Sequence, residues 1–254
     1  MVSEHERGEQ GGHAVDVTFF VPCLNEEKNV TGALEVIVAA ATEVGVQYEI
    51  LVVDDCSTDG TVAVVEAFAG QHPNVPMVLR KNERNQGLGR NYTEGARIAR
   101  GRYYMLVNGD NVERREVLVA LLPKLGHADI VVPFFGALDN RPLLRRIISR
   151  SFTKLVNLVS GTSVRYYNGA VVHLRENVAK CPPGTRGFGY QAELITRLLA
   201  EGASYVEVEV PGEERQEGAT KAFRPRNVLS VAGSLLRIGL QRFQHGKRTP
   251  QDTT

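Results

Sequence analysis

The chain has 254 residues, of which 43% are hydrophobic and 23% are charged, as is ordinary for a globular protein of one large or two small domains. No run approaches the roughly 18 apolar residues of a membrane-spanning helix, and the polar N-terminus lacks the apolar region of a secretion signal. Three widely spaced cysteines without a CxxC pair favour neither a disulfide framework nor a zinc site, so we expect a cytoplasmic protein.

Charge is distributed unevenly along the chain, although the net charge is only +1. Residues 1–140 contain 20 acidic and 12 basic residues, whereas residues 141–254 contain 9 acidic and 18 basic residues. The acidic first part is suited to a divalent cation, and the basic second part to phosphate or an anionic surface. A chance drift of surface charge is the alternative explanation.

Strands and helices are predicted to alternate through the first half of the chain. Short, mostly apolar runs predict strands at residues 16–22, 48–53, 75–80, 103–107 and 129–132. Apolar residues at helical spacing predict helices at residues 29–44, 61–69, 91–99 and 114–125. This alternation is typical of an α/β fold with a mostly parallel sheet flanked by helices, whose ligands bind beyond the carboxyl ends of the strands.

The second half has a less regular pattern. Helices are predicted at residues 141–160, 190–201 and 225–243, and the first and last of these combine apolar with basic residues. Strands are predicted at residues 170–174 and 205–210, and loops at residues 182–189 and 212–220. Residues 1–14, rich in Glu, Gly and His, are expected to form a disordered tail.

Polar clusters follow the predicted strands of the first half. They are Asn25-Glu26-Glu27, Asp54 to Asp59, Asn85 to Arg90, and Asn108 to Asn111. The absence of G-x-G-x-x-G after the first strand and of a Walker A loop disfavours hydride transfer and P-loop chemistry. Because Mg²⁺ is usually held by one or two carboxylates plus substrate phosphates, Asp110 with the amide of Asn108 is a candidate metal site. Asp59-Gly60 is better explained as a turn.

These clusters resemble a known family when they are taken together. The family is glycosyltransferase family 2, which has the GT-A fold, and the matching segments are Phe20-Val-Pro22-Cys-Leu-Asn25-Glu26-Glu27, Asp54-Asp55-Cys-Ser57-Thr-Asp59-Gly60 and Asn85-Gln-Gly87-Leu-Gly89-Arg90. Asn108-Gly109-Asp110 stands in the place of that family's DxD metal motif. Within the family, residues 187–194, 205–211 and 214–221 are similar to the dolichyl- or polyprenyl-phosphate sugar synthases. The resemblance covers roughly residues 16–240.

The resemblance implies a metal-dependent, inverting glycosyltransferase that uses a nucleoside-diphosphate sugar with Mg²⁺ or Mn²⁺. It implies a nucleoside site made of Pro22, Asn25, Glu26, Asp54 and Asp55. Asp110 would bind the metal, with Asn108 beside it as a neutral amide in place of the first acid. That departure predicts a lower metal affinity, or a metal role that rests on Asp110 alone.

The second half would then hold the acceptor. Glu193 is placed near the acceptor, Arg215 and Lys221 would clamp acidic oxygens, and Arg90 is a further candidate for the pyrophosphate. The implied division is a catalytic domain at residues 15–222, with a nucleotide-binding part at 15–135 and an acceptor part at 136–222, followed by an amphipathic helix and tail at 223–254.

Two classes of acceptor remain open, because they need different chemistry. A polyprenyl phosphate is already ionised and needs cations such as Arg150, Arg215 and Lys221 for positioning, whereas a hydroxyl of a soluble molecule needs a base, for which Glu193 is the candidate. A catalytically silent nucleotide-sugar-binding protein is the third possibility, since Asn108 could mark lost metal chemistry.

The basic second half also predicts a partner. Residues 141–175 contain no acid, and their apolar and basic residues recur at helical spacing, as they do again in residues 220–251. Such helices can lie in a membrane interface, so peripheral contact with the inner face of a membrane is expected; packing on the sheet or a dimer interface is the alternative. Without an aromatic platform, nucleic acid is disfavoured, and the sequence leaves the oligomeric state, the base and the sugar open.

Overall fold

The computed structural model describes residues 15–136, 139, 141–182, 189–212 and 225–246, the last segment with side chains only at 232–243. Seven strands form one sheet in the order β3-β2-β1-β4-β6-β5-β7. Their bounds are β1 (Val17–Cys23), β2 (Tyr48–Asp54), β3 (Met77–Lys81), β4 (Tyr103–Leu106), β5 (Ile130–Phe135), β6 (Val172–Leu174) and β7 (Tyr205–Val210). Only β6 runs antiparallel to its neighbours, which confirms the predicted mostly parallel sheet.

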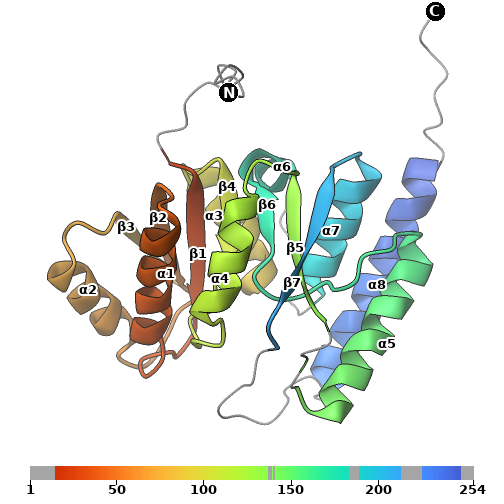
Figure 1. Cartoon of the computed structure of the whole chain (residues 1–254). Coiled ribbons are helices and arrows are strands. Elements are labelled where there is room, and N and C mark those ends of the chain that lie inside the picture. Colours follow the sequence, from red (N-terminus) through yellow and green to blue (C-terminus); the bar gives the residue numbers. More distant parts are fainter. Residues whose placement is uncertain (1–14, 137–138, 140, 183–188, 213–224, 247–254) are drawn as a thin grey trace, which may run out of the picture.

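Helices cover both faces of the sheet (Figure 1). One face carries α1 (Val30–Val44), α2 (Thr61–Gln71) and α4 (Arg115–Leu121), and the other carries α3 (Leu88–Ile98), α6 (Arg175–Lys180) and α7 (Tyr190–Ala200). Two longer helices, α5 (Leu143–Ser160) and α8 (Pro225–Gly246), pack side by side next to α7. No helix in the described ranges has both the length and the apolar character needed to cross a bilayer.

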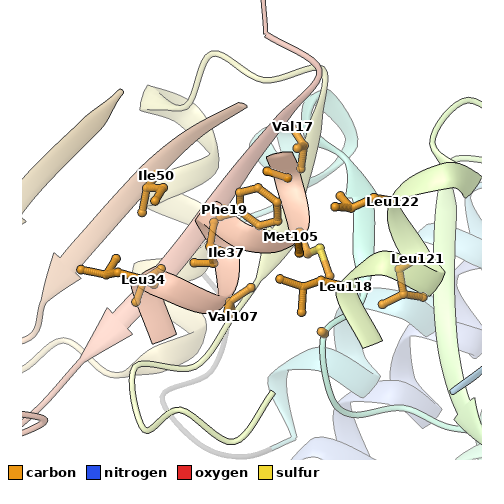
Figure 2. Close-up of a cluster of buried hydrophobic side chains, with 14 of the residues drawn as sticks. Val17, Phe19, Leu34, Ile37, Ile50, Met105, Val107, Leu118, Leu121 and Leu122 are labelled. Carbon is orange, nitrogen blue, oxygen red and sulfur yellow. The ribbon is translucent and has the colours of Figure 1, made fainter. Parts of the chain in front are cut away.

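The core forms because successive strand residues point to opposite faces of the sheet. Val17 and Phe19 of β1 pack with Leu34 and Ile37 of α1 in one cluster, as Figure 2 shows. Phe20, one residue further along β1, belongs instead to the cluster beneath α3 and α7. Burial on both faces explains why the inner strands β1, β2 and β4 are mostly apolar in sequence.

Several elements differ from the sequence predictions. The helix expected at 91–99 begins at Leu88, after a turn in which Gly87 has a φ of 85°. The helix expected at 114–125 ends at Leu121 and continues as the 3-10 turn η1 (Leu122–Lys124), because Pro123 lacks a backbone N–H. The helix α6 was not predicted.

The strand expected to end at residue 132 continues to Phe135 and includes Pro133. Its pairing with β6 stops at Val131, while its pairing with β7 runs to Phe135. Pro133 is tolerated because the β6 side of β5 has no strand partner at that point. The sheet also joins both halves of the chain, since β6 and β7 of the second half lie on either side of β5 of the first half.

Candidate active site

The order of the strands places the site at the carboxyl end of β1. The chain builds β1, β2 and β3 outward in one direction and then returns to add β4 on the other side of β1. Ligands of open α/β sheets bind in the crevice where the strand order reverses in this way. Two hydrogen bonds fix this end: the Asp55 N–H donates to Cys23 O at 2.8 Å, and the Gly109 N–H donates to Pro22 O at 3.3 Å. The predicted acidic segments therefore flank one strand end, on either side of half-buried Pro22.

The loops after β1 and β2 are held together by reciprocal hydrogen bonds. The Asn25 N–H donates to Ser57 Oγ at 2.9 Å, and the Thr58 N–H donates to Asn25 Oδ1 at 2.8 Å. Gly60 N–H donates to Glu27 Oε2 at 3.0 Å. Asn25 has a φ of 60°, a left-handed conformation in which Asn is enriched among non-glycine residues. The side-chain amide oxygen of Asn25 thus helps to hold the two loops together.

Glu26 lies at the start of α1, half-buried in the same loop pair. Its backbone N–H donates to Thr61 Oγ1 at 2.9 Å, and its carboxylate accepts a hydrogen bond from Asn29 Nδ2 at 2.9 Å. The described contacts of Asn25 and Glu26 are therefore those of residues that shape the edge of the site.

Asp54 and Asp55 are adjacent and buried, but their carboxylates have different surroundings. Asp54 is 4% exposed; its Oδ2 accepts one hydrogen bond, from the Ser57 N–H at 3.2 Å, and its Oδ1 has no hydrogen-bond partner among the described residues. A buried carboxylate oxygen without a donor is costly. The Asp54 carboxylate is therefore suited to accept a hydrogen bond from a ligand.

Both oxygens of the Asp55 carboxylate, in contrast, accept hydrogen bonds from other residues of the chain. Oδ1 accepts hydrogen bonds from the Gln86 N–H at 2.7 Å and from Asn82 Nδ2 at 2.9 Å, and Oδ2 accepts one from the Gly87 N–H at 2.9 Å. Burial alone raises the pKa of Asp55, but these donors, the Gln86 N–H foremost, outweigh it and hold the pKa below its ordinary value. Asp55 thus positions the loop that precedes α3.

The segment after β4 approaches the end of β1 very closely at Gly109. A Cβ atom at this position would lie 2.8 Å from both Cys23 Sγ and Pro22 O, so only glycine fits without a shift of the backbone. Asn108 and Asp110, on either side of Gly109, are both half-buried. The side chain of Asn108 donates through Nδ2 to the buried carboxylate of Glu113, which leaves its amide oxygen for another partner.

These residues fit a divalent cation in the chemistry of their donors. Asp110 offers one carboxylate and Asn108 one amide oxygen, and oxygen ligands with substrate phosphates complete the usual coordination of Mg²⁺. Within the described residues, no three His, Cys, Asp or Glu side chains gather as a self-contained metal site. A cation here would therefore depend on the phosphates of a bound nucleotide.

Arg90 lies on α3 and is bound to an acid of its own helix. Its Nε donates to Glu94 Oε1 at 2.6 Å, and Arg80 of β3 donates to Glu94 Oε2 at 3.0 Å. Burial raises the pKa of Glu94, but the two guanidinium groups lower it by more. Because Arg80 and Arg90 share the single carboxylate of Glu94, the three side chains together carry a net charge of +1, and the role of Arg90 at a pyrophosphate stays a prediction.

Glu193 lies in the first turn of α7, is 9% exposed and has a guanidinium partner that the sequence analysis missed. Arg237 of α8 donates to both oxygens of Glu193, from Nε at 3.1 Å to each and from Nη2 at 2.9 Å to Oε1. The two helices can approach because Gly189 leaves room for Ser234, whose Oγ would lie 2.0 Å from an added Cβ. Arg215 and Lys221, the two residues predicted to clamp acidic oxygens, lie outside the described residues.

Glu113 and Arg237 are the main site-lining residues that sequence reasoning did not find. Glu113 is 3% exposed and lies just before α4, in a stretch that reads as an ordinary polar turn. Arg237 lies 44 residues from its partner Glu193 and resembles any basic residue of an amphipathic helix. Arg237 carries no local signal, because only tertiary packing brings it to Glu193. Glu113 lies five residues from Asn108, and its place in the sequence alone does not show that the two residues are hydrogen-bonded.

Comparisons with known proteins show which sequences and folds this chain is similar to. The chain is 26% identical over 257 residues to a dolichyl-phosphate beta-glucosyltransferase of Trichomonas vaginalis, covering 94% of this chain and 74% of that protein. It is 29% identical over 217 residues to the polyprenol monophosphomannose synthase of Mycolicibacterium smegmatis, covering 79% and 78%. The fold is similar to that of glucosyl-3-phosphoglycerate synthase from Mycobacterium tuberculosis in complex with Mn²⁺, uridine diphosphate and phosphoglyceric acid, with a TM-score of 0.65 at 17% identity, covering 89% and 79%.

The mostly parallel sheet and its flanking helices are those of the GT-A fold. The model of the family described as glycosyl transferase family 2 matches residues 18–180. The chain belongs to that family, as the sequence analysis predicted.

Proposed function

We propose that this enzyme transfers a sugar from a nucleoside-diphosphate sugar to a polyprenyl phosphate, with inversion at the anomeric carbon and with Mg²⁺ or Mn²⁺ at the donor. The observation that carries the proposal is the placement of two unlike groups around the end of β1. On one side lies the buried Asp54 oxygen that lacks a donor, and on the other lie Asn108 and Asp110. The first suits the hydroxyl or N–H groups of a nucleoside, and the second suits a diphosphate with its cation.

The reaction is a single displacement. An oxygen of the acceptor phosphate attacks the anomeric carbon as the bond from that carbon to the diphosphate oxygen breaks, and the nucleoside diphosphate leaves. Asp110 and Asn108 would hold the cation, which when bound neutralises charge on the leaving diphosphate. Asp54, with Pro22 and Glu26 at the edge of the crevice, would bind the base or ribose, while Asp55 and Asn25 hold the loops that shape it.

The ion pair between Glu193 and Arg237 favours a phosphate acceptor over a hydroxyl acceptor. A general base needs a carboxylate oxygen that can reach the proton it removes. Both oxygens of Glu193 already accept hydrogen bonds from Arg237. A phosphate acceptor is ionised at neutral pH and needs no base, so this ion pair is compatible with transfer to phosphate, in which Arg150, Arg215 and Lys221 would position the acceptor oxygens.

A transfer assay tests the proposed function directly. UDP-glucose and GDP-mannose are each incubated with Mn²⁺ and either a polyprenyl phosphate or the matching polyprenol, which lacks only the phosphate. We expect product with the phosphate alone, and a Glu193→Gln variant that keeps at least part of the activity. Transfer to the polyprenol or to a soluble hydroxyl, lost in Glu193→Gln, would instead support the base mechanism. No turnover and no Mn²⁺-dependent sugar-nucleotide hydrolysis would support a silent binding protein.

A lipid acceptor requires that the enzyme reach a membrane, and an exposed apolar surface on α5 and α8 fits that need. Eight large apolar side chains of these helices are 43–75% exposed. We call them the α5–α8 apolar surface; they are Leu143, Leu144, Ile147, Leu155, Leu158, Leu236, Leu240 and Phe243. Exposed clusters of this kind mark sites of interaction.

The charges beside this surface suit an anionic leaflet. Of the basic residues in 141–175, Arg141 and Arg146 are bound to Asp139, Arg165 to Glu207 and Arg175 to Glu176. The cations of that stretch outside these ion pairs are Arg145, Arg150 and Lys154, all on α5. Each Lys or Arg near an anionic leaflet contributes roughly 1 kcal/mol. We therefore propose peripheral contact of the α5–α8 apolar surface with the inner face of an anionic membrane.

Flotation on liposomes measures this contact. The wild-type protein is expected to rise with vesicles that contain phosphatidylglycerol at low salt, and less at high salt because screening weakens the charge term. The variant Leu158→Ser/Leu240→Ser should partition at least tenfold less, because burial of one leucine is worth roughly 1.5–3 kcal/mol. Ile98→Ser on α3, which changes another exposed apolar residue (51%), is the control and should float like the wild type.

Two other results would contradict membrane contact. A wild-type protein that stays with the soluble fraction under all conditions would remove this part of the proposal. A wild-type dimer that the double serine variant converts to monomers would show that the surface binds a second copy of the chain.

A further inference from the structure

Glu113 holds Asn108 from two directions. Its Oε2 accepts a hydrogen bond from the Asn108 backbone N–H at 3.0 Å, and its Oε1 accepts one from the Asn108 side-chain Nδ2. Glu113 is 3% exposed and lies five residues further along the chain, immediately before the segment that leads into α4. A buried carboxylate that accepts two donors from a single residue fixes both the backbone and the side-chain rotamer of that residue.

This contact requires an amide, and not a carboxylate, at position 108. An aspartate there would place an oxygen where Nδ2 now donates, in contact with Oε1 of Glu113. Two carboxylates in contact repel each other strongly. The neutral residue at position 108 and the buried acid at position 113 are thus complementary, and together they carry a single negative charge.

We infer that Glu113 is a positioning residue that turns the amide oxygen of Asn108, beside Asp110, toward the diphosphate of the donor, and that it supplies the negative charge which Asn108 lacks. This inference rests on the proposed function, because the donor gives the orientation its purpose. By this inference, Asn108 functions together with Glu113 at the metal site, and its neutral side chain is not a sign that metal chemistry has been lost.

A double-mutant cycle tests the interaction between Asn108 and Glu113. It compares the wild type, Asn108→Asp, Glu113→Gln and the double variant Asn108→Asp/Glu113→Gln. The first readout is Tm without metal or nucleotide. Asn108→Asp should lower Tm by about 5 °C, because it adds a repelling carboxylate. The double variant should recover to within about 2 °C of the wild type, because the glutamine amide can donate to the new carboxylate. Coupling of this kind between contacting residues is what such a cycle measures.

The second readout is the affinity for UDP and for GDP in the presence of Mn²⁺, measured by calorimetry. Glu113→Gln should bind the preferred nucleotide roughly tenfold more weakly, since Asn108 loses its anchor and the local charge is lost. The double variant should return to within about threefold of the wild type. The matched control is Glu116→Gln, which removes an exposed carboxylate in the first turn of α4 and should bind like the wild type.

The outcomes separate this inference from the proposed function. Additive effects in the cycle, or an Asn108→Asp protein as stable as the wild type, would overturn the role of Glu113. Rescue of Tm without rescue of nucleotide affinity would show that Glu113 only stabilises the fold, which also overturns it. A wild-type protein that binds neither UDP nor GDP with Mn²⁺ would overturn the proposed function, while the Tm cycle would still report on the pair.

Discussion

Replacement of Asp110 by alanine is expected to lower kcat/KM for sugar transfer by roughly a hundred- to a thousandfold and to abolish the response to Mn²⁺. Asp110 carries its carboxylate beside the crevice between β1 and β4, where the strand order reverses. Gly109 allows this segment to lie in close contact with Pro22 and Cys23. With the carboxylate absent, charge on the departing diphosphate is poorly balanced. Initial rates over a series of Mn²⁺ concentrations provide the measurement.

The fold of Asp110→Ala should survive, because the residue is only half-buried and lies in a loop. A Tm within a few degrees of the wild type would show that lost activity is a loss of chemistry. The control is again Glu116→Gln, an exposed acid nearby. If Asp110→Ala retained full activity with an unchanged Mn²⁺ response, the assignment of the metal site would be wrong.

The substitution Asp55→Asn is expected to have the second large effect, a loss of stability of the folded protein. The substitution places an NH₂ group against the N–H of Gly87 or that of Gln86, so a donor meets a donor where a carboxylate accepted. Loss of a charged hydrogen bond, with a buried donor left unsatisfied, costs about 3 kcal/mol, which is a fall in Tm of roughly 10 °C for a chain of this size. The loop before α3 should lose its order as well, and urea unfolding at neutral pH measures the change.

The same variant should alter the pH dependence of stability. The pKa of Asp55 in the folded protein lies below the ordinary value of about 3.9, because hydrogen-bond donors outweigh burial. Its contribution is therefore fully present above about pH 4 and is lost as the pH falls through the lower, folded-state pKa. The difference in unfolding free energy between wild type and Asp55→Asn should shrink over that acidic range.

Asp54→Asn is the matched control, since it makes the same change one residue earlier. Asp54 accepts a single hydrogen bond from the chain, at 3.2 Å, and its other oxygen has no partner in the described structure. This variant should keep most of the stability and bind nucleotide about tenfold more weakly. Equal stability losses in the two variants would contradict the different roles that we assign to these aspartates.

The sequence determined the type and order of nearly every element, because hydrophobic period and turn residues are local properties. Strands such as 48–53 and helices such as 29–44 agree with β2 and α1 to within a residue. The sequence also placed the polar clusters at strand ends, and the resemblance that they carried gave the family. Two of the errors lie where a neighbouring segment decides: Pro133 remains in β5 because of how β6 ends, and α3 begins early at a turn held by Asp55.

Only the tertiary structure decided what each polar side chain contacts. Asp54 and Asp55 are the same residue type side by side, yet one has a buried oxygen for which the described residues supply no donor, and the other holds a loop some 30 residues away. The partner of Glu193 follows from packing across the fold, because Arg237 lies 44 residues away along the chain. The pairing of Asn108 with Glu113, five residues further on, depends on how the loop after β4 folds and is buried. The physical reason is that a pattern of residues fixes local conformation, whereas the state of a charge depends on burial and on donors brought from distant parts of the chain.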